Sequence, residues 1–267
     1  MREPLEDRMR EYEAVTRAVL PRRTYTLIRV DGRAFRTFLK RAAKPFDHDV
    51  MASMDGVARA LCAEIAGAAF AYAQSDEVSV LATDFATTTT QPWFGGVVQK
   101  MASVSASIAT EAFNREYGIR HQGVATFDAR VFTIPDPAEV GNYFLWRQRD
   151  GARNAVSMAA RAHFSHRELH GVSTEAARER LRTERGVDYE TYPSGARLGR
   201  VCTREVYQEE VTYTHKRTGQ VHASPATRSR WTIAAAPEFD ATRGWLSEHI
   251  PACPAAPVHQ GGTVVTS

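Results

Sequence analysis

The sequence predicts an α+β fold: a four-stranded antiparallel sheet covered on one face by two helices, followed by an appended helical and β-hairpin region. Two observations predict it. Between residues 24 and 135, four short β-branched or aromatic segments are separated by two longer segments whose apolar residues keep a helical period. They follow one another as strand, helix, strand, strand, helix, strand, which is the ferredoxin-like or split βαβ order.

Composition narrows the class of protein. The chain has 267 residues, of which 43% are hydrophobic and 24% charged, values typical of a globular protein. Three cysteines without CxxC spacing argue for a reducing compartment and against a thiolate zinc site. No apolar run could span a bilayer, and the charged N-terminus offers no secretory signal, so we expect a cytoplasmic protein without membrane contact. A net charge of +3 permits a polyanionic partner without requiring one.

The first elements follow from turn and capping signals. A helix is expected over residues 4–19, because prolines stand near its start and just beyond its end. The apolar residues Leu5, Met9, Tyr12 and Val19 would share one face of it. TYTLIRVDG at 24–32 is predicted to be a strand that stops at an Asp-Gly pair. Residues 49–67 keep a helical period and end in glycine, a common C-cap.

The second half of the pattern is a hairpin, a helix and a strand. AAFAYAQSD at 68–76 and EVSVLAT at 77–83 abut with almost no loop, which favours a hairpin with its turn near Asp76. Residues 97–118 again carry a helical apolar stripe. GVATFDARVFTIP at 123–135 is predicted to be the last strand, ended by its proline.

The remaining chain divides into an appended region and a tail. Asp136-Pro137-x-Glu139 is a helix start with the spacing of a capping box. Helices are expected over 137–149, 151–164 and 173–185, and a β-rich stretch over 197–214 and 220–223 with KRTG as its turn. Prolines and a Gly-Gly pair predict a flexible tail. We therefore expect a catalytic region at 1–135, a fingers-like region for nucleotide, tRNA and subunit contacts at 136–250, and the tail at 251–267.

Two carboxylates fall where the first strand and the hairpin meet. Side chains alternate along strands, and these strands are neighbours in a split βαβ sheet, so Asp31 and Asp76 can converge on the open face of the sheet. Such a pair suits two Mg²⁺ ions, which can clamp the attacking and leaving oxygens of a phosphoryl displacement. Taken singly, Asp31-Gly32 and Ser75-Asp76 are more typical of turns than of a catalytic site. Together, on this order of elements, they favour the two-carboxylate palm that polymerases and nucleotide cyclases share.

Longer motifs occur in a fixed order over roughly residues 1–205. They are VDGRAFRTF (30–38), KPFD (44–47), QSDEVS (74–79), VQKMASVSAS (98–107), FDARVF (127–132) and YFLWRQRDGARNAVSMAARAHFS (143–165). In these motifs the chain resembles the tRNA-His guanylyltransferase family, enzymes that add nucleotides in the 3′-to-5′ direction. RNAVSMAARAHFSHRELHG resembles the bacterial and archaeal guanylyltransferase-like branch. Eukaryotic members have HINNLYN, which serves the tRNA-His anticodon, where this chain has RNAVSMA.

The resemblance implies a polymerase-type palm and a reaction in two steps. ATP would first activate a tRNA 5′-monophosphate, leaving a 5′-adenylylated end. The 3′-hydroxyl of GTP, or of another NTP paired to a template base, would then displace AMP. Two Mg²⁺ ions would serve as cofactors, and the family implies a homotetramer in which tRNA contacts several subunits.

The resemblance also implies which residues act. Asp31 and Asp76 would hold the metals with the backbone carbonyl of Gly32, and Glu77 would be an auxiliary catalytic carboxylate. The residues implied to contact the nucleotide are Gly32, Arg33, Ala34, Phe35, Arg36, Lys44, Asp47, Ser75, Lys100 and Asn154. A lysine suits phosphate because its compact ammonium neutralises oxygens without a fixed fork geometry. Arg130, Arg147, Gln148 and Asp150 lie in matching motifs without assigned duties.

Two departures from the family pattern bear on phosphate binding. Arg36 stands where the family often has histidine, so the nucleotide contact there would differ. Gly95-Gly96-Val97 precede the VQK motif, where basic residues are usual. The missing charge would weaken one phosphate subsite unless arginines from elsewhere, including another subunit, supply it.

Several of these residues also have a purely structural interpretation. Asp47 could cap the following helix, Lys100 could extend along an apolar face, and Arg147 and Asp150 could form a helix-surface pair. His163, His166 and His170 have helical spacing, but nothing else supports zinc, so packing or RNA contact is preferred. The arginines at 178, 180, 182 and 185 alternate with glutamates, as on a solvated helix face.

We therefore expect a Mg²⁺-dependent nucleotidyltransferase that adds GTP or templated NTPs to the 5′ end of tRNA. Two alternatives stay open. A palm-type nucleotide cyclase would have a GGDEF-like hairpin where this chain has QSDEVS. A non-catalytic RNA-binding module on the same topology would need stacking aromatics on its central strands, which FDARVF and AFAYAQSD do not supply.

Overall fold

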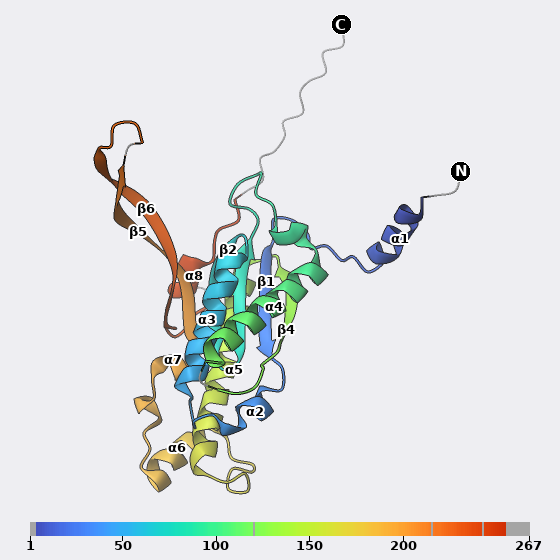
Figure 1. Ribbon diagram of the computed structural model, residues 1–267. Coiled ribbons are helices and arrows are strands. Elements are labelled where there is room, and N and C mark those ends of the chain that lie inside the picture. The colour runs from blue at the N-terminus through green and yellow to red at the C-terminus, as the bar shows by residue number, and fades with distance from the viewer. Residues whose placement is uncertain (1–3, 120, 215, 242, 255–267) are drawn as a thin grey trace.

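The computed structural model describes residues 4–119, 121–214, 216–241 and 243–254. Its centre is a six-stranded sheet in the order β4-β1-β3-β2-β5-β6, with every neighbouring pair antiparallel (Figure 1). The strands are β1 (Tyr25–Gly32), β2 (Ala68–Gln74), β3 (Glu77–Thr83), β4 (Phe127–Ile134), β5 (Arg200–Thr214) and β6 (Val221–Ala235). The first four have the order of a ferredoxin-like sheet, so the predicted α+β fold is confirmed.

Helices α3 (His48–Glu64) and α4 (Val98–Tyr117) cover one face of the sheet, as predicted. They lie beside one another in front of the strands in Figure 1. Alternate strand residues, including Ile28 and Val80, are fully buried against them. The apolar side chains that alternate along the strands thus pack against the apolar stripes of the two helices in one core.

The other face of the sheet is not open, contrary to our expectation. Helix α5 (Pro137–His163) packs on it, and Val140 and Phe144 are buried against Leu27 and Phe70. The helix covers this face because the strands also carry large apolar side chains here, which water would otherwise contact. Asp31 lies on the same side, so the carboxylates sit at the edge of a covered face.

Helix α5 is continuous, whereas the sequence predicted two helices at 137–149 and 151–164. That prediction is wrong because Gly151 does not end the helix. A methyl group at Gly151 would lie 2.5 Å from Cγ of Gln74, so the glycine allows α5 to approach β2 closely. The predicted start is confirmed: the Asp136 carboxylate accepts from the backbone N–H groups of Ala138 and Glu139.

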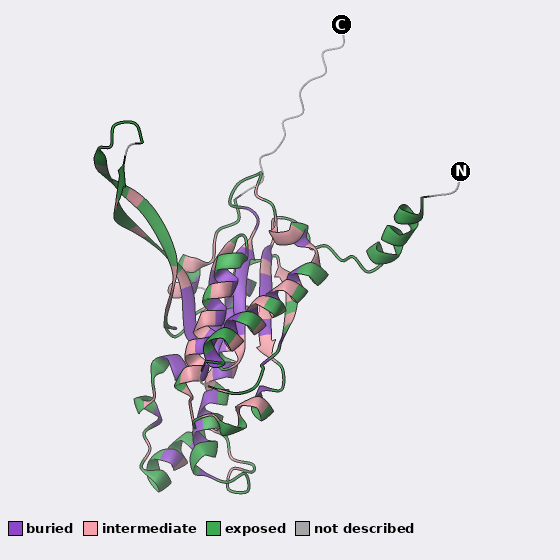
Figure 2. Cartoon of the chain, in the orientation of Figure 1, coloured by how far each residue is buried: buried purple, intermediate pink, exposed green. Residues whose placement is uncertain are grey.

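The β5–β6 hairpin is longer than predicted. Its second strand continues to Ala235, not 223. The inner end of β5 pairs with β2 and extends the central sheet, and the outer part projects from the body (Figure 1). Most of that outer part is exposed (Figure 2), so its sequence lacks the alternation by which a half-buried strand is recognised. The sheet therefore joins the two regions that we divided at residue 135.

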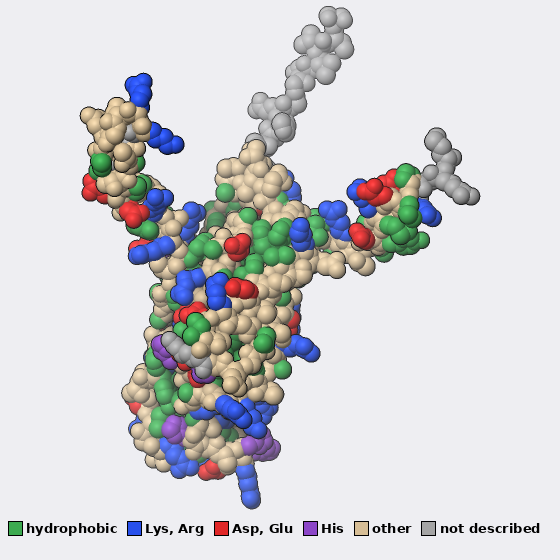
Figure 3. Space-filling model, viewed as in Figure 1, with side chains coloured by type: hydrophobic (Ala, Val, Ile, Leu, Met, Phe, Trp, Pro, Cys, Tyr) green, Lys and Arg blue, Asp and Glu red, His purple; other side chains and the backbone are tan. Residues whose placement is uncertain are grey.

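Helix α1 (Leu5–Ala14) is shorter than the predicted 4–19 and has no buried residue. It projects from the body on the side opposite the hairpin (Figure 1). Leu5, Met9 and Tyr12 of its predicted apolar face are 65%, 46% and 75% exposed, and Figure 3 shows hydrophobic side chains on its surface. Within one subunit this apolar face contacts no core.

Shorter elements complete the chain. They are α2 (Phe35–Phe38), α6 (Thr174–Arg185), α7 (Ser194–Arg197), α8 (Trp245–His249) and the 3₁₀ turns η1 (Leu39–Arg41), η2 (Trp93–Gly96) and η3 (Tyr189–Thr191). Helix α6 packs on the C-terminal half of α5 through Ala177 and Leu181. Of the predicted tail, Pro251 and Pro254 accept hydrogen bonds from Tyr25 and Arg23, and 255–267 lie outside the described residues. No helix in the described part is long and apolar enough to cross a membrane.

Candidate active site

Strand pairing brings the predicted carboxylates together. Asp31 lies opposite Glu77 in the β1–β3 pair, and the backbone N–H of Gly32 donates to the carbonyl of Asp76 at 3.0 Å. Between β2 and β3 the chain turns at Ser75, which has a left-handed φ of 54°. As a result, Asp31 and Asp76 line the same pocket, whose volume is about 750 Å³.

The pocket is lined by both acidic and basic side chains. Asp31, Asp76 and Glu77 line it at the strand ends. Besides Arg147, which pairs with Glu77, four cations line it: Arg36, Lys40, Lys44 and Arg161. None of the four forms an ion pair with a carboxylate of the described residues, and only Lys44 makes a hydrogen bond, to the carbonyl of Leu39 at 3.2 Å. Carboxylates and unpaired cations that line one pocket suit a polyphosphate bound together with metal ions.

The two aspartates repel one another in a poorly solvated place. Burial raises the pKa of Asp76 above its ordinary value, and the charge of Asp31 raises it further. Burial also raises the pKa of Asp31, with a contribution from Asp128 on the neighbouring strand and an opposing one from Arg29. Arg29, whose Nη2 lies 3.5 Å from Asp31 Oδ2, compensates the charge of the pair only in part.

The donor set of this pair fits a magnesium ion. The described residues contain no group of three or more His, Cys, Asp or Glu side chains arranged to hold a metal. Asp31, Asp76 and the Gly32 carbonyl instead offer two carboxylates and one backbone oxygen. Mg²⁺ takes oxygen ligands, often only one or two carboxylates, and fills its remaining positions with water and substrate phosphates.

Glu77 has a different environment from the two aspartates. Arg147 of α5 donates from Nε and Nη2 to its two carboxylate oxygens, both at 2.7 Å. Nε of Arg29 lies 3.5 Å from it. Burial raises the pKa of Glu77 and these arginines oppose the rise. With its oxygens bound by Arg147, the predicted auxiliary carboxylate ties α5 to β3 beside the aspartates.

The structure shows the contacts of residues to which the sequence assigned no role. Gln148 donates to the carbonyls of Leu198 and Pro237 at 3.2 and 2.8 Å and accepts from the N–H of Phe239 at 2.7 Å. It thereby fixes two loops against α5. Asp150 pairs with Arg147 at 3.5 Å and with Arg153 at 2.9 Å. Arg130, on β4, does not line the pocket.

Of the predicted nucleotide contacts, Phe35, Arg36, Lys44, Ser75 and Asn154 line the pocket with the carboxylates. They come from three parts of the chain that are far apart in sequence. Phe35 packs against Phe113 and Phe127, which anchors the turn after β1. The structure therefore brings together half of the predicted nucleotide residues and all three predicted carboxylates.

The other predicted contacts lie elsewhere. Gly32 ends β1, Arg33 and Ala34 form the turn after it, and none of the three lines the pocket; the Arg33 N–H donates to the carbonyl of Thr126, and Ala34 has φ 55°. The Asp47 carboxylate accepts from the N–H groups of Ala43 and Val50 at 2.7 and 3.0 Å, which makes it the N-cap of α3.

Lys100, another predicted contact, does not line the pocket. Its ammonium lies 4.7 Å from the ring centroid of Phe94, near the start of α4. Phe113 of the same helix is the residue that reaches Phe35, and the helical rise places Lys100 roughly 20 Å away along the axis. Within one subunit, Lys100 therefore lies outside the pocket lining, and its contact with the nucleotide stays a prediction.

Sequence reasoning missed Lys40 and Arg161, which line the pocket. Arg161 shares a helix face with Asn154, seven residues earlier, and that spacing was a usable signal. Lys40 had none, because only the turns after β1 bring it to the pocket.

Comparison with known proteins agrees with this geometry. A family model described as "Thg1: tRNAHis guanylyltransferase" matches residues 6–135. The solved bacterial tRNA(His) guanylyltransferase (Thg1)-like protein in complex with ATP is 34% identical with a TM-score of 0.81, covering 93% of this chain and 99% of that one. The chain belongs to the tRNA(His) guanylyltransferase family. Membership makes it a nucleotidyltransferase and favours neither a nucleotide cyclase nor a non-catalytic RNA-binding module.

Two further relatives extend the comparison. A bacterial Thg1-like protein in complex with GTP is 34% identical, with a TM-score of 0.71, and the match covers 88% of this chain and 94% of that one. The tRNA(His) guanylyltransferase of Debaryomyces hansenii is 28% identical over 201 residues, 68% of this chain and 74% of the relative. Both family resemblance and fold thus extend well past residue 135 into the appended region.

Proposed function

We propose that this protein is a Mg²⁺-dependent 3′-to-5′ nucleotidyltransferase that adds GTP, or templated NTPs, to the 5′ end of tRNA after ATP-dependent 5′-adenylylation. One observation carries the proposal: Asp31 and Asp76 line a pocket that also holds unpaired cations. The relatives solved with ATP and with GTP support both nucleotides as substrates.

The residues in and beside the pocket would have three different roles. Asp31 and Asp76, together with the carbonyl of Gly32 next to the pocket lining, would hold Mg²⁺, which would neutralise charge at the reacting phosphate. Arg36, Lys40 and Lys44 would bind the triphosphate, since none of them is paired with a carboxylate of the described chain. Glu77, held by Arg147, keeps α5 in place above the pocket.

The proposed reaction consists of two phosphoryl transfers. An oxygen of the tRNA 5′-phosphate attacks the α-phosphorus of ATP, and pyrophosphate leaves. The 3′-hydroxyl of GTP then attacks the 5′-phosphate of the adenylylated tRNA, loses its proton, and AMP leaves. Positioning and charge neutralisation lower the barrier of such steps, so the protein needs no covalent nucleophile.

The assembly and location belong to the same proposal. We expect a cytoplasmic homotetramer, in which residues 1–135 supply the chemistry and 136–250 contact nucleotide, tRNA and neighbouring subunits. The exposed apolar face of α1 supports association, because large apolar side chains without a partner mark interaction surfaces. Basic residues are missing just before Lys100, so arginines of another subunit would supply the positive charge of that phosphate subsite.

Labelled nucleotide addition to a 5′-truncated tRNA tests the chemistry. Asp31→Ala and Asp76→Ala should each abolish addition and leave the fold intact, whereas Glu111→Ala, an exposed carboxylate on α4, should not change activity. Near-normal activity of both aspartate variants refutes the metal assignment. Product formation without RNA would favour the cyclase, and a lack of Mg²⁺-dependent NTP binding in equilibrium dialysis would favour the RNA-binding module.

A further inference from the structure

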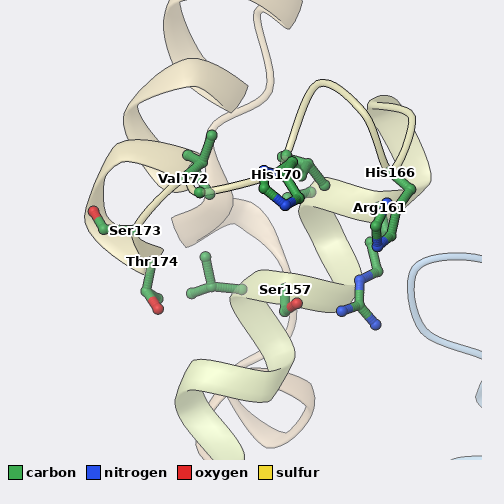
Figure 4. A pocket seen from close by; sticks show the side chains of 12 residues that line it. Ser157, Arg161, His166, His170, Val172, Ser173 and Thr174 are labelled. Atoms are coloured by element: carbon green, nitrogen blue, oxygen red, sulfur yellow. The ribbon is translucent and has the colours of Figure 1, made fainter.

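A second pocket lies beside the candidate active site. It has a volume of about 310 Å³ and is formed by the C-terminal half of α5, the loop after it and the start of α6. His166 and His170, which the sequence analysis singled out and the proposed chemistry does not use, both line it. Figure 4 shows Arg161 and His166 on one side, Thr174 on the other, and Ser157 between them.

The two pockets share a wall. Ser157 and Arg161 line both of them. These residues are four apart on α5 and therefore form one ridge of the helix. Asn154 and Met158 face the first pocket, and Val156 and Ala160 line the second, so α5 separates the two. A chain-like ligand that leaves the first pocket over this ridge enters the second.

The second pocket is suited to an anion. Arg161, His166 and His170 make no side-chain hydrogen bond or ion pair with the described residues, and no acidic side chain lines the pocket. The N-terminus of the twelve-residue helix α6 contributes Ser173 and Thr174. Its positive dipole end adds to the charge of Arg161 and to the hydrogen-bonding capacity of the two imidazoles.

We propose that this second pocket binds a backbone phosphate of the RNA substrate, next to the nucleotide whose 5′ end reacts. This inference rests on the proposed function, because it takes the RNA substrate from there. The phosphate bound here is not the reacting one, since α5 lies between it and the aspartates. Such a contact fixes the register of the strand and carries no sequence information.

An RNA phosphate fits the pocket better than a phosphate of the free nucleotide does. The first pocket, at about 750 Å³, is large enough for a whole nucleoside triphosphate. The ridge of Ser157 and Arg161 then separates the second pocket from it, and an RNA strand has further phosphates that can occupy it. Arg161, shared by both pockets, would lie between consecutive phosphates of that strand.

A pair of variants at Thr174 tests the proposal. Thr174 lines only the second pocket and stands in the first turn of α6, where an acidic side chain stabilises the helix. Thr174→Glu should therefore fold, yet repel a phosphate; Thr174→Gln has nearly the same size without the charge. We expect Thr174→Glu to bind a 5′-monophosphorylated, 5′-truncated tRNA roughly tenfold more weakly than Thr174→Gln at moderate salt.

Two further measurements complete the test. Affinity for ATP, measured without RNA, should be equal in the two variants. His166→Ala/His170→Ala should weaken RNA binding as well, and Arg167→Ala, in the same loop but outside the pocket, should weaken it less. Thermal unfolding of each variant shows that the fold is retained.

Three outcomes would overturn the inference. Equal RNA affinity of the two Thr174 variants would show that no RNA phosphate binds here. Weaker ATP binding with unchanged RNA binding would assign the pocket to the free nucleotide. Equal losses in the histidine variant and Arg167→Ala would indicate only a general effect of charge. If the wild type extends tRNA normally in these cases, the proposed function still stands.

Discussion

At the scale of single residues, the demands of chemistry and of stability conflict at Asp76. Its side chain lies beside Asp31 at the end of the sheet, and burial and that neighbour both raise its pKa. An ionised carboxylate in such a place lowers the stability of the fold unless a cation compensates it. The carboxylate pair is therefore explained by the ion it would hold and not by the stability of the sheet.

This conflict predicts the effect of Asp76→Asn. Without metal, the variant should have a free energy of unfolding about 1 kcal/mol higher than the wild type, because the buried charge and its repulsion by Asp31 are removed. Added Mg²⁺ should stabilise the wild type more than the variant and reduce the difference. Urea unfolding with EDTA and with Mg²⁺ measures both effects. A less stable variant in EDTA would show that the aspartates do not repel one another.

At the pair of Glu77 and Arg147, in contrast, removal of one charged side chain should lower the free energy of unfolding. Both side chains are 13% exposed, and removal of one leaves a buried charge behind. Arg147→Ala should lower the free energy of unfolding by about 3 kcal/mol. Arg153→Ala, which breaks an exposed pair with Asp150, should cost less than about 1 kcal/mol. Denaturant unfolding measures both values. If the two variants lost similar amounts of stability, the pair of Glu77 and Arg147 would contribute no more than an exposed ion pair does.

At the scale of elements, the N-cap of α3 fixes the loop that carries Lys44. Asp47 bonds both to Val50 in the helix and to Ala43 in the loop, so one carboxylate holds the two together. An asparagine caps helices about as well as an aspartate and an alanine does not. The two substitutions therefore separate the cap from the charge.

We predict that Asp47→Ala lowers the free energy of unfolding by about 1 kcal/mol and raises the KM for the nucleotide, because Lys44 loses its anchored loop. Asp47→Asn should keep a free energy of unfolding and a KM close to those of the wild type. Thermal unfolding and initial rates over a range of GTP concentrations give the two values. An equally high KM for Asp47→Asn would instead show that the charge of Asp47 contacts the ligand.

The close approach of α5 to β2 depends on Gly151. Alanine is the better helix former by about 1 kcal/mol, yet its methyl group would lie 2.5 Å from Cγ of Gln74. Gly151→Ala should therefore lower stability by about 1–3 kcal/mol and reduce activity, since α5 carries Asn154 and Arg161. Urea unfolding measures the loss. An unchanged or higher stability would mean that α5 shifts without cost.

At the scale of the whole molecule, two exposed projections leave the body, helix α1 and the β5–β6 hairpin (Figure 2). Because α1 buries nothing within its own chain, substitutions on its apolar face should not alter subunit stability. The helix therefore allows association to be tested apart from folding.

We expect the wild type to be a tetramer by light scattering, and Leu5→Ser/Met9→Ser/Tyr12→Ser to form smaller species with an unchanged circular dichroism spectrum. Arg8→Ser/Glu13→Ser, on the same helix, is the control for a general effect of substitution. A monomeric wild type would contradict the proposed tetramer. A tetrameric triple variant would show that subunits associate elsewhere.

The sequence by itself determined the central strands and the position of the carboxylate pair. Period-two alternation and helical stripes placed β1 to β4 and the helices between them, because each element buries one face of its own chain segment. The same alternation put Asp31 on the face now covered by α5, and the tight hairpin put Asp76 beside it. Local pattern sufficed there because strand order follows from the order of elements.

Only the tertiary structure decided the rest. The Arg147 pair with Glu77, the Gln148 bonds and the place of Arg161 join segments that are distant in sequence. Neither Gly151 nor the exposed outer half of β6 could be interpreted locally, since a glycine both ends helices and admits close contacts, and a solvated strand has no apolar face. Local sequence encodes which face of an element is apolar, whereas which element covers it depends on the free energy of the whole packed chain.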